Sequence, residues 1–146
     1  MVIEYCFDDE KHTCDSFDDL IKLDNYNDII YINCSDCNLK ELPKLPNSLE
    51  EIYCANNMLT LLPELPNSLI ELYCSNNMLK LLPKLPNSLE EFECSNNQLI
   101  IFPKLPPKFQ DSIHNIYGNP VYDYIQNKCG GKLKIYHKVN QTFANK

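Results

Sequence analysis

The sequence predicts an α/β repeat solenoid, with a short parallel sheet on its concave side and extended segments on its convex side. Residues 49–108 repeat one phrase three times, as LEEIYCANNMLTLLPELPNS, LIELYCSNNMLKLLPKLPNS and LEEFECSNNQLIIFPKLPPK. The period is 20 residues without slippage, and a fixed period of this length is typical of proteins whose successive coils stack. Each phrase also combines a strand-like half with a proline-rich half, which together make one coil.

The strand-like half carries the period of a β-strand. In the second copy, Leu72 and Cys74 alternate with Tyr73, which indicates a short strand with the first two side chains inside. Tyr73 then faces away from the core, on the same side as Glu71 and Ser75. The strands of successive coils are therefore expected to form the parallel sheet.

One asparagine follows each strand at the same place, as Asn57, Asn77 and Asn97. This position falls on the inside of the bend, where a buried amide must find hydrogen-bond partners. We expect a ladder in which each side chain bonds to the backbone of its own coil and of the next one.

The second half of each copy is rich in Leu-Pro pairs. Two prolines three residues apart, such as Pro83 and Pro86, remove amide donors and disfavour helix. The return path is therefore predicted to be extended and polyproline-like. Its leucines form the other wall of the core, at Leu62, Leu65, Leu82 and Leu85.

The complete pattern, LxxLxCxxNxLxxLPxLPxS, resembles that of leucine-rich repeat proteins. Its 20-residue form with an LPxLP segment is similar to the repeat domains of bacterial type III effectors of the Yersinia outer protein M and invasion-plasmid-antigen type, and to leucine-rich repeat proteins of giant DNA viruses. The resemblance covers residues 29–121 and implies a right-handed solenoid that binds proteins. Effectors that act as ubiquitin ligases carry a large catalytic domain after their repeats, and the remaining tail here is too short for it.

Three segments are predicted from composition and pattern. Residues 1–28 form an acidic N-terminal cap, with an edge strand over residues 2–7 and a short helix that begins after Ser16. Residues 29–121 form the solenoid of about five coils, of which the first and last are divergent. Residues 122–146 form a C-terminal cap and a basic tail.

The divergent coils keep the key positions. In the first coil, Cys34 holds the strand cysteine and Cys37 stands where the ladder asparagine is expected. In the last coil two extra residues place Ile116, Asn119 and Val121 at the cysteine, asparagine and leucine positions. A closing helix over residues 121–128 and a strand over residues 133–138 are expected beyond it.

The charge of the chain restricts the classes of partner that it is expected to bind. The formal net charge is −7, and all 13 basic residues are lysines. An acidic body argues against a nucleic-acid groove, and the absence of arginine removes bidentate phosphate recognition. The first 20 residues contain no apolar core of a signal peptide and no run suits a membrane span, so an intracellular protein is expected, in the host cytoplasm if it is viral.

The eight cysteines do not indicate a disulfide framework or a metal site. Four of them (Cys34, Cys54, Cys74 and Cys94) occupy one inward position, and buried free cysteine acts as a small hydrophobic residue. Zinc sites usually have two ligand pairs, whereas the chain has one CxxC. Cys6, His12 and Cys14 are a weaker alternative cluster.

No catalytic constellation is present in the sequence. The three histidines, His12, His114 and His137, have no nucleophile or carboxylate at a motif spacing, and there is no phosphate-binding loop. We therefore expect a protein that is not an enzyme and that needs no cofactor.

The predicted binding site is the row of side chains that points out of the sheet. Tyr31, Tyr53 and Tyr73 are expected in one row continued by Glu93, and Glu51, Glu71 and Glu91 in the next. Stacked tyrosines also stabilise sheets, and glutamates keep surfaces soluble, so a purely structural role stays open. The expected function is the binding of a protein with a basic surface to this concave face, by a monomer; the alternatives are a structural or self-assembly role and, more weakly, an adaptor for ubiquitination.

Overall fold

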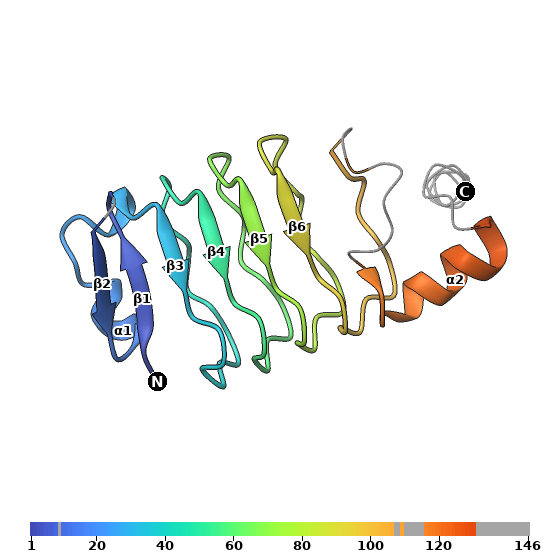
Figure 1. Ribbon diagram of the computed structural model, residues 1–146, viewed down its shortest axis with the longest axis horizontal. Coiled ribbons are helices and arrows are strands. Elements are labelled where there is room, and N and C mark those ends of the chain that lie inside the picture. The colour runs from blue at the N-terminus through green and yellow to red at the C-terminus, as the bar shows by residue number, and fades with distance from the viewer. Residues whose placement is uncertain (9, 107–108, 110–115, 131–146) are drawn as a thin grey trace.

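The computed structural model describes residues 1–8, 10–106, 109 and 116–130. The predicted strand over residues 133–138 and most of the predicted basic tail lie outside these residues. The described chain forms a row of stacked coils, with the strands side by side along its length (Figure 1).

Six strands form one sheet in the order β2-β1-β3-β4-β5-β6. The four solenoid strands pair in parallel, and they are β3 (Tyr31–Asn33), β4 (Glu51–Tyr53), β5 (Glu71–Tyr73) and β6 (Glu91–Glu93). Their register follows the 20-residue period, since Ile52 pairs with Leu72 and Leu72 pairs with Phe92. The predicted solenoid with a short parallel sheet is therefore confirmed.

The core runs between the strands and the extended segments. Cys54, Cys74 and Cys94 are fully buried in successive coils, as predicted. The leucines before each strand, Leu49, Leu69 and Leu89, are buried as well. Each coil has too little apolar surface to form a core of its own, so the stacking of neighbouring coils is what buries it.

The predicted asparagine ladder is present, although its direction differs from the prediction. The amide Nδ2 of Asn57 donates to the carbonyl of Cys54 in its own coil and to that of Cys34 in the coil before it, at 3.1 and 2.9 Å. Its Oδ1 accepts the N–H of Leu39 at 2.9 Å. The second coil that Asn57 contacts is thus the preceding one and not the following one. The bend brings its amide next to Cys34, at the end of the strand of that preceding coil.

The extended segments follow a period of three residues. Leu59, Leu62 and Leu65 are buried, whereas Met58, Leu61 and Glu64 are exposed. This spacing agrees with the three residues per turn of a polyproline-type chain, which the Leu-Pro pairs predict. The alternation recurs in the next two coils, except that Leu82 is only partly buried, so the outward positions of successive coils form rows on the side opposite the sheet.

The N-terminal segment forms a hairpin and a short helix. β1 (Ile3–Cys6) lies between β2 (Lys11–Cys14) and β3 and pairs antiparallel with both, so the predicted edge strand is wrong and β2 is at the edge. Helix α1 (Phe17–Leu20) begins after Ser16, whose Oγ accepts the N–H of Asp19 at 3.2 Å, as predicted. A 3-10 turn, η1 (Tyr26–Asp28), leads into the first coil.

At the other end, Asn119 takes the ladder position that was predicted for it. Its Oδ1 accepts the N–H of Leu99 at 2.9 Å, and its Nδ2 donates to the carbonyl of Cys94 at 3.0 Å. Helix α2 (Pro120–Cys129) follows at once and buries Val121, Ile125 and Cys129. It ends at Gly130 in the left-handed conformation, so the predicted closing helix is confirmed.

Candidate functional site

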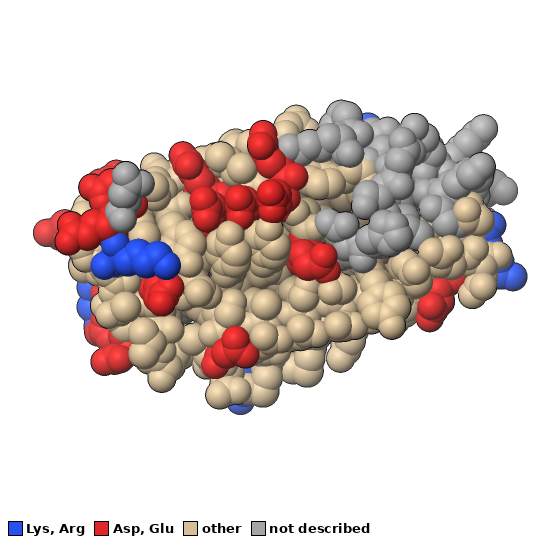
Figure 2. Space-filling model, in the orientation of Figure 1, with Lys and Arg blue, Asp and Glu red and all other residues tan. Residues whose placement is uncertain are grey.

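The open face of the sheet is the side of β3–β6 that points away from the leucine core. Two rows cross it, as the strand register sets them. The glutamate row contains Tyr31, Glu51, Glu71 and Glu91, and the tyrosine row contains Asn33, Tyr53, Tyr73 and Glu93. Figure 2 views this side of the molecule and shows acidic atoms gathered over the middle strands.

Tyr31 is not in the row that the sequence predicted for it. It pairs with Glu51, one strand position away from the tyrosine row, where Asn33 pairs with Tyr53. Tyr31 nevertheless contacts Tyr53 diagonally, with ring centroids 5.6 Å apart. The structure therefore brings all seven predicted residues onto one face, with this change of row.

Tyr53 and Tyr73 form the aromatic centre of the open face. Their ring centroids are 4.7 Å apart and their planes differ by 6°, which is a stacked pair. Both side chains are half-buried, so each ring keeps an edge available to a partner. Two rigid rings held in register offer a large contact area at a small cost in side-chain entropy.

Hydrogen bonds join the two rows across strands. The hydroxyl of Tyr53 donates to Glu71 Oε2 at 2.6 Å, and that of Tyr73 donates to Glu91 Oε2. Each tyrosine thus binds the glutamate of the following coil. Glu51 has no such tyrosine donor, because Asn33 holds the corresponding place in the preceding coil.

These contacts change the acidity of the face. Burial and the neighbouring glutamates, Glu71 first, raise the pKa of Glu51. The hydrogen bond to Glu91 and burial raise the pKa of Tyr73 to about 12, and burial together with the hydrogen bond to Glu71 raises the pKa of Tyr53. At neutral pH the tyrosines are therefore neutral donors and the face carries negative charge only on its carboxylates.

Lys11 lies at the N-terminal end of the open face. Its Nζ is 5.5 Å from the centroid of the Tyr31 ring and 3.6 Å from Glu4 Oε2. Basic atoms are visible at the β1–β2 end in Figure 2. One lysine of the chain is thus already placed between an aromatic face and a carboxylate on this surface.

Glu93 also has a structural task. Its Oε1 accepts the N–H of Ser95 and the hydroxyl of Ser75, both at 3.2 Å. Asn33 Oδ1 makes the equivalent bond to the N–H of Ser35 at 3.1 Å. Glu93 therefore fastens the turn after its strand and is less free to contact a partner than Glu51.

The alternative cluster of Cys6, His12 and Cys14 does not come together as a metal site. His12 pairs with Tyr5 in the hairpin and stacks on its ring, with centroids 5.3 Å apart. Among the described residues, no group of three or more His, Cys, Asp or Glu side chains is arranged to hold a metal ion. In the same part of the chain, no helix has the length and apolar character needed to cross a membrane.

The four strand cysteines, Cys34, Cys54, Cys74 and Cys94, are buried in the core behind this face. Cys54, Cys74 and Cys94 are fully buried, and burial raises the pKa of each thiol well above its ordinary value. A protonated thiol in the core is a poor nucleophile. These residues belong to the packing of the coils.

The stacked coils and the open face of their sheet together define a leucine-rich repeat solenoid. No model of a protein family matches the chain, and no curated protein matches it. Among solved structures, YopM from Yersinia pestis, described as a leucine-rich effector protein, is 45% identical over 52% of this chain, with a TM-score of 0.51. YopM from Yersinia enterocolitica WA-314 is 36% identical over 56% of the chain, with a TM-score of 0.49, and a Shigella effector leucine-rich repeat domain is 31% identical over 53%, with a TM-score of 0.48.

The chain spans only part of these proteins. The match covers 22% of the Yersinia pestis protein, 18% of the Yersinia enterocolitica protein and 44% of the Shigella domain. The similarity therefore concerns the repeat scaffold.

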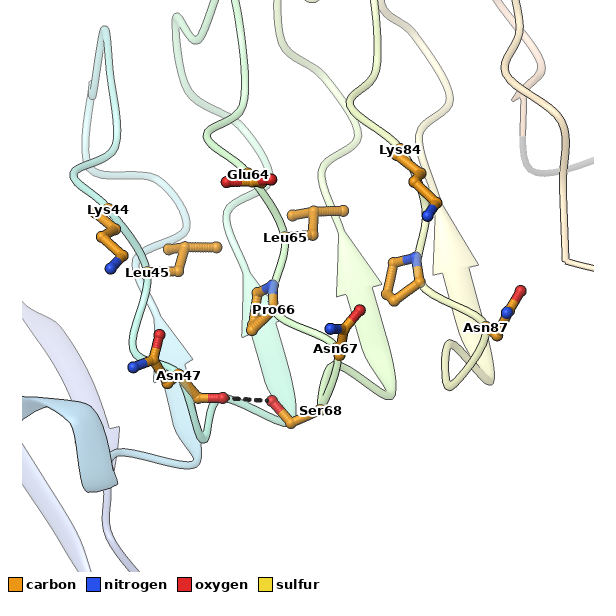
Figure 3. A pocket seen from close by; sticks show the side chains of 11 residues that line it. Lys44, Leu45, Asn47, Glu64, Leu65, Pro66, Asn67, Ser68, Lys84 and Asn87 are labelled. Carbon is orange, nitrogen blue, oxygen red and sulfur yellow. Dashed lines mark hydrogen bonds between the residues drawn. The ribbon is translucent and has the colours of Figure 1, made fainter.

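Sequence reasoning missed two features of the surface. The tyrosine–glutamate bonds join residues 18 apart, and no sequence motif marks them. A shallow hollow of about 640 Å³ also lies between the turns of the outer side, lined by repeated side chains that include Lys44, Glu64 and Lys84 (Figure 3). The 20-residue period could have indicated that these three side chains lie side by side, since they occupy one repeat position.

Proposed function

We propose that this protein is a non-enzymatic binding module that holds a partner protein on the open face of its sheet. The partner surface is basic and carries lysine or arginine side chains. In keeping with the resemblance to effector and giant-virus repeats, we propose a host protein as the partner and the host cytoplasm as the place of binding.

The observation that carries the proposal is the stacked pair Tyr53–Tyr73 beside a row of carboxylates. Aromatic side chains anchor protein interfaces, and here two of them are held in place by hydrogen bonds to the next coil. The carboxylates of Glu51, Glu71 and Glu91 lie in register on adjacent strands, so their charges repel one another. A cationic partner relieves this repulsion.

Lys11 offers a model for the contact within the chain itself. Its ammonium group lies over Tyr31 and beside Glu4. A basic side chain of a partner that binds further along the face meets the same combination of ring and carboxylate at Tyr53, Tyr73 and the glutamate row. The choice of a basic partner rests on this chemistry.

The comparison with the Yersinia pestis protein supports a binding role for the scaffold. That protein is described as a leucine-rich effector, and 45% identity over 52% of this chain links the two scaffolds. In leucine-rich repeat solenoids the surface positions vary while the core positions persist, so the partner has to be deduced from this chain's own face.

The test is a pull-down from host-cell lysate with the tagged full chain and its triple variant Tyr53→Ala/Tyr73→Ala/Glu71→Lys. We expect the wild type to capture a protein of high isoelectric point and the variant to lose it. The matched control is Tyr124→Ala/Glu41→Lys, which removes an exposed tyrosine and reverses an exposed glutamate outside the open face. Circular dichroism checks that all three proteins are folded.

A second step removes the dependence on lysate. The captured partner, once purified, is titrated against the wild type and both variants at two salt concentrations. We expect weaker binding by the wild type at high salt, since screening reduces the attraction between opposite charges. Equal capture by wild type and triple variant, or a captured partner with an acidic surface, contradicts the proposal.

A further inference from the structure

The open face of the sheet is lined by acidic residues. The four solenoid strands and the residue before each strand contain no lysine, and they contain six glutamates, Glu50, Glu51, Glu71, Glu90, Glu91 and Glu93. Tyr53 and Tyr73 each donate to one oxygen, Oε2, of Glu71 and of Glu91 respectively. A carboxylate can accept hydrogen bonds on both of its oxygens, so these two glutamates can also bind an ammonium group. The face therefore suits a basic occupant.

The sequence that follows the described helix α2 has the opposite charge. Residues 131–146 contain four lysines and no acidic residue. Lys134 and Lys138 alternate with apolar residues and stand on either side of Tyr136. Side chains two residues apart point to the same side of an extended chain, so this sequence can present two ammonium groups and an aromatic ring together. Such a set of side chains is the complement of the open face.

Gly130, the last described residue, is close enough to the sheet for residues 131–146 to reach it. Asn119 donates to the carbonyl of Cys94, directly after β6, at 3.0 Å, and α2 begins at the next residue. A helix of 10 residues is about 15 Å long, which puts Gly130 within about 30 Å of the end of β6. Lys138 follows after about 26 Å of extended chain, and its long side chain adds to this reach. It can therefore meet the carboxylates of β6 and β5, which are about 5 Å apart.

Lys11 already shows how a lysine is held on this face. Its Nζ lies 5.5 Å from the centroid of the Tyr31 ring and 3.6 Å from Glu4 Oε2. At the β6 end of the face, Tyr73 and Glu91 offer the same combination of a ring and a carboxylate, joined by a hydrogen bond. A lysine that approaches from α2 meets a site of the same kind.

We propose that residues 131–146 fold back over the β6 end of the open face and hold Lys138 against the carboxylates of Glu91 and Glu71. The segment then covers the face until a basic partner displaces it, so the contact is autoinhibitory. It forms within one molecule, in keeping with the monomer expected from the sequence. The contact itself stands without the proposed function, whereas its inhibitory effect rests on that function.

The other surfaces of the molecule suit the basic segment less well. The outer side of the coils exposes Lys44, Lys84 and Lys104, which repel further lysines. The acidic N-terminal hairpin lies at the opposite end of the row of coils from α2 (Figure 1), beyond β3 in the strand order. Lys138 meets the glutamates of β6 and β5 before it can reach that hairpin. The open face is therefore the nearest acidic surface to the segment.

Covering of this kind sets a threshold for binding. A tethered segment acts at a high effective concentration, and the apparent affinity of a competing ligand falls by the fraction of molecules in which the face is open. A ligand that offers lysines alone competes poorly with the segment. A partner that adds contacts to Tyr53 and to Glu51, further along the face, displaces it.

The first test is zero-length cross-linking of the full chain with a carbodiimide, which joins a lysine to a carboxylate only where the two are in contact. We expect peptide mass spectrometry to find Lys138 linked to Glu91 or Glu71, and high salt to suppress the link. The experiment uses an equal mixture of unlabelled and nitrogen-15-labelled protein. Links within one molecule then join peptides with the same label, whereas links between molecules also join peptides with different labels.

The second test measures the affinity of the peptide octalysine by isothermal titration calorimetry. The variant Lys134→Gln/Lys138→Gln/Lys146→Gln should bind octalysine about tenfold more tightly than the wild type, because its face is open. The matched control, Lys44→Gln/Lys84→Gln/Lys104→Gln, removes the same charge from the outer side and should change the affinity by less than about threefold. Adding Glu71→Lys to the first variant should abolish its gain, and circular dichroism checks that every variant is folded.

Several outcomes overturn the proposal. Links from residues 131–146 only to acids of residues 1–28, links only between molecules, or no link at all rule out the contact with the open face. Equal affinities of the two triple variants for octalysine rule out the covering effect. Neither test uses the lysate, so the two proposals fail separately: the Lys138 link without any captured partner refutes the proposed function alone, and capture on the open face without the link refutes the contact alone.

Discussion

Asn77 Oδ1 accepts the backbone N–H of Leu59 at 2.9 Å, across the boundary between two coils. The amide Nδ2 of Asn77 donates in addition to the carbonyls of Cys54 and Cys74, at 3.0 and 3.2 Å. One buried side chain therefore satisfies backbone groups of two successive coils at the bend where no strand partner reaches them. Because buried backbone groups without partners are costly, this relationship fixes both the bend and the stacking.

The substitution Asn77→Ala is expected to lower the free energy of unfolding by about 3 kcal/mol, since it leaves a buried N–H and buried carbonyls unsatisfied. Urea unfolding followed by circular dichroism measures the loss. The control is Asn67→Ala at the exposed turn of the preceding coil, where we expect a change within about 0.5 kcal/mol. A loss of under about 1 kcal/mol for Asn77→Ala would show that the ladder is dispensable.

Gly118 is expected to tolerate no side chain. Its φ is +70°, and a Cβ at this position would collide with Asn96 Oδ1. Gly118→Ala should therefore strain the backbone and displace Asn96, whose N–H donates to the carbonyl of Tyr117 at 2.8 Å. We expect a loss of about 1–3 kcal/mol in unfolding by urea.

Gly130 provides the matched control for this prediction. It also has a positive φ, of 56°, but an added Cβ would meet nothing within 4 Å. Gly130→Ala is therefore expected to cost about 1 kcal/mol, from the left-handed conformation alone. Equal losses for the two substitutions would mean that the contact with Asn96 has no weight.

The sequence predicted the inward positions of this protein well. Once the 20-residue period is known, Cys74, Asn77 and Leu79 follow from one another, and the structure buries all three. The period even located Asn119 in the last coil, despite the two extra residues before it. Such positions are predictable because burial and hydrogen-bond satisfaction leave few residue types able to fill them.

The surface was predicted less well, and Tyr31 shows why. Tyr31 and Tyr53 are 22 residues apart, two more than the period, so they lie on the same face but in neighbouring rows. The sequence-based prediction placed Tyr31 in the tyrosine row because of its residue type. The register between β3 and β4 is instead the one in which Ile32 pairs with Ile52. The pairing of β1 with β2 was also missed, because residues 11–14 lack the apolar alternation that marks a strand.

Glu51 predicts how stability depends on pH. Its pKa in the folded protein is raised above the ordinary value of 4.5 by burial, Glu71 and other glutamates. The folded state then holds the proton more tightly than the unfolded state, so the protonated carboxyl favours folding below pH 4.5. This contribution is lost as the pH rises through the raised pKa.

The substitution Glu51→Gln should therefore make the protein more stable than the wild type at pH 7, and the difference should shrink as the pH falls below 4.5. Urea unfolding of both proteins across this range measures the difference. Glu41 is exposed and lies outside the open face, so Glu41→Gln serves as the control for removing one negative charge. If Glu51→Gln gains no more stability than Glu41→Gln at neutral pH, the surroundings of Glu51 do not disfavour its charged form.

The cysteines are expected to separate into two classes of reactivity. Cys54, Cys74 and Cys94 have fully buried thiols with raised pKa values, whereas Cys14 and Cys37 are partly exposed. Alkylation by iodoacetamide under native conditions, followed by peptide mass spectrometry, should modify the second class first. The first class should react at a rate set by opening of the coils, since both burial and protonation protect it.

Urea provides the internal control for this experiment, because unfolding should bring all the cysteines to similar rates of alkylation. The variant Asn77→Ala tests whether the asparagine ladder protects the buried thiols from alkylation. If its loss of stability arises at the bend between coils, the thiols of Cys54 and Cys74 should react faster in the variant than in the wild type, while the rate at Cys37 stays the same. Rapid native alkylation of Cys74 in the wild type would contradict the buried position of the strand cysteines.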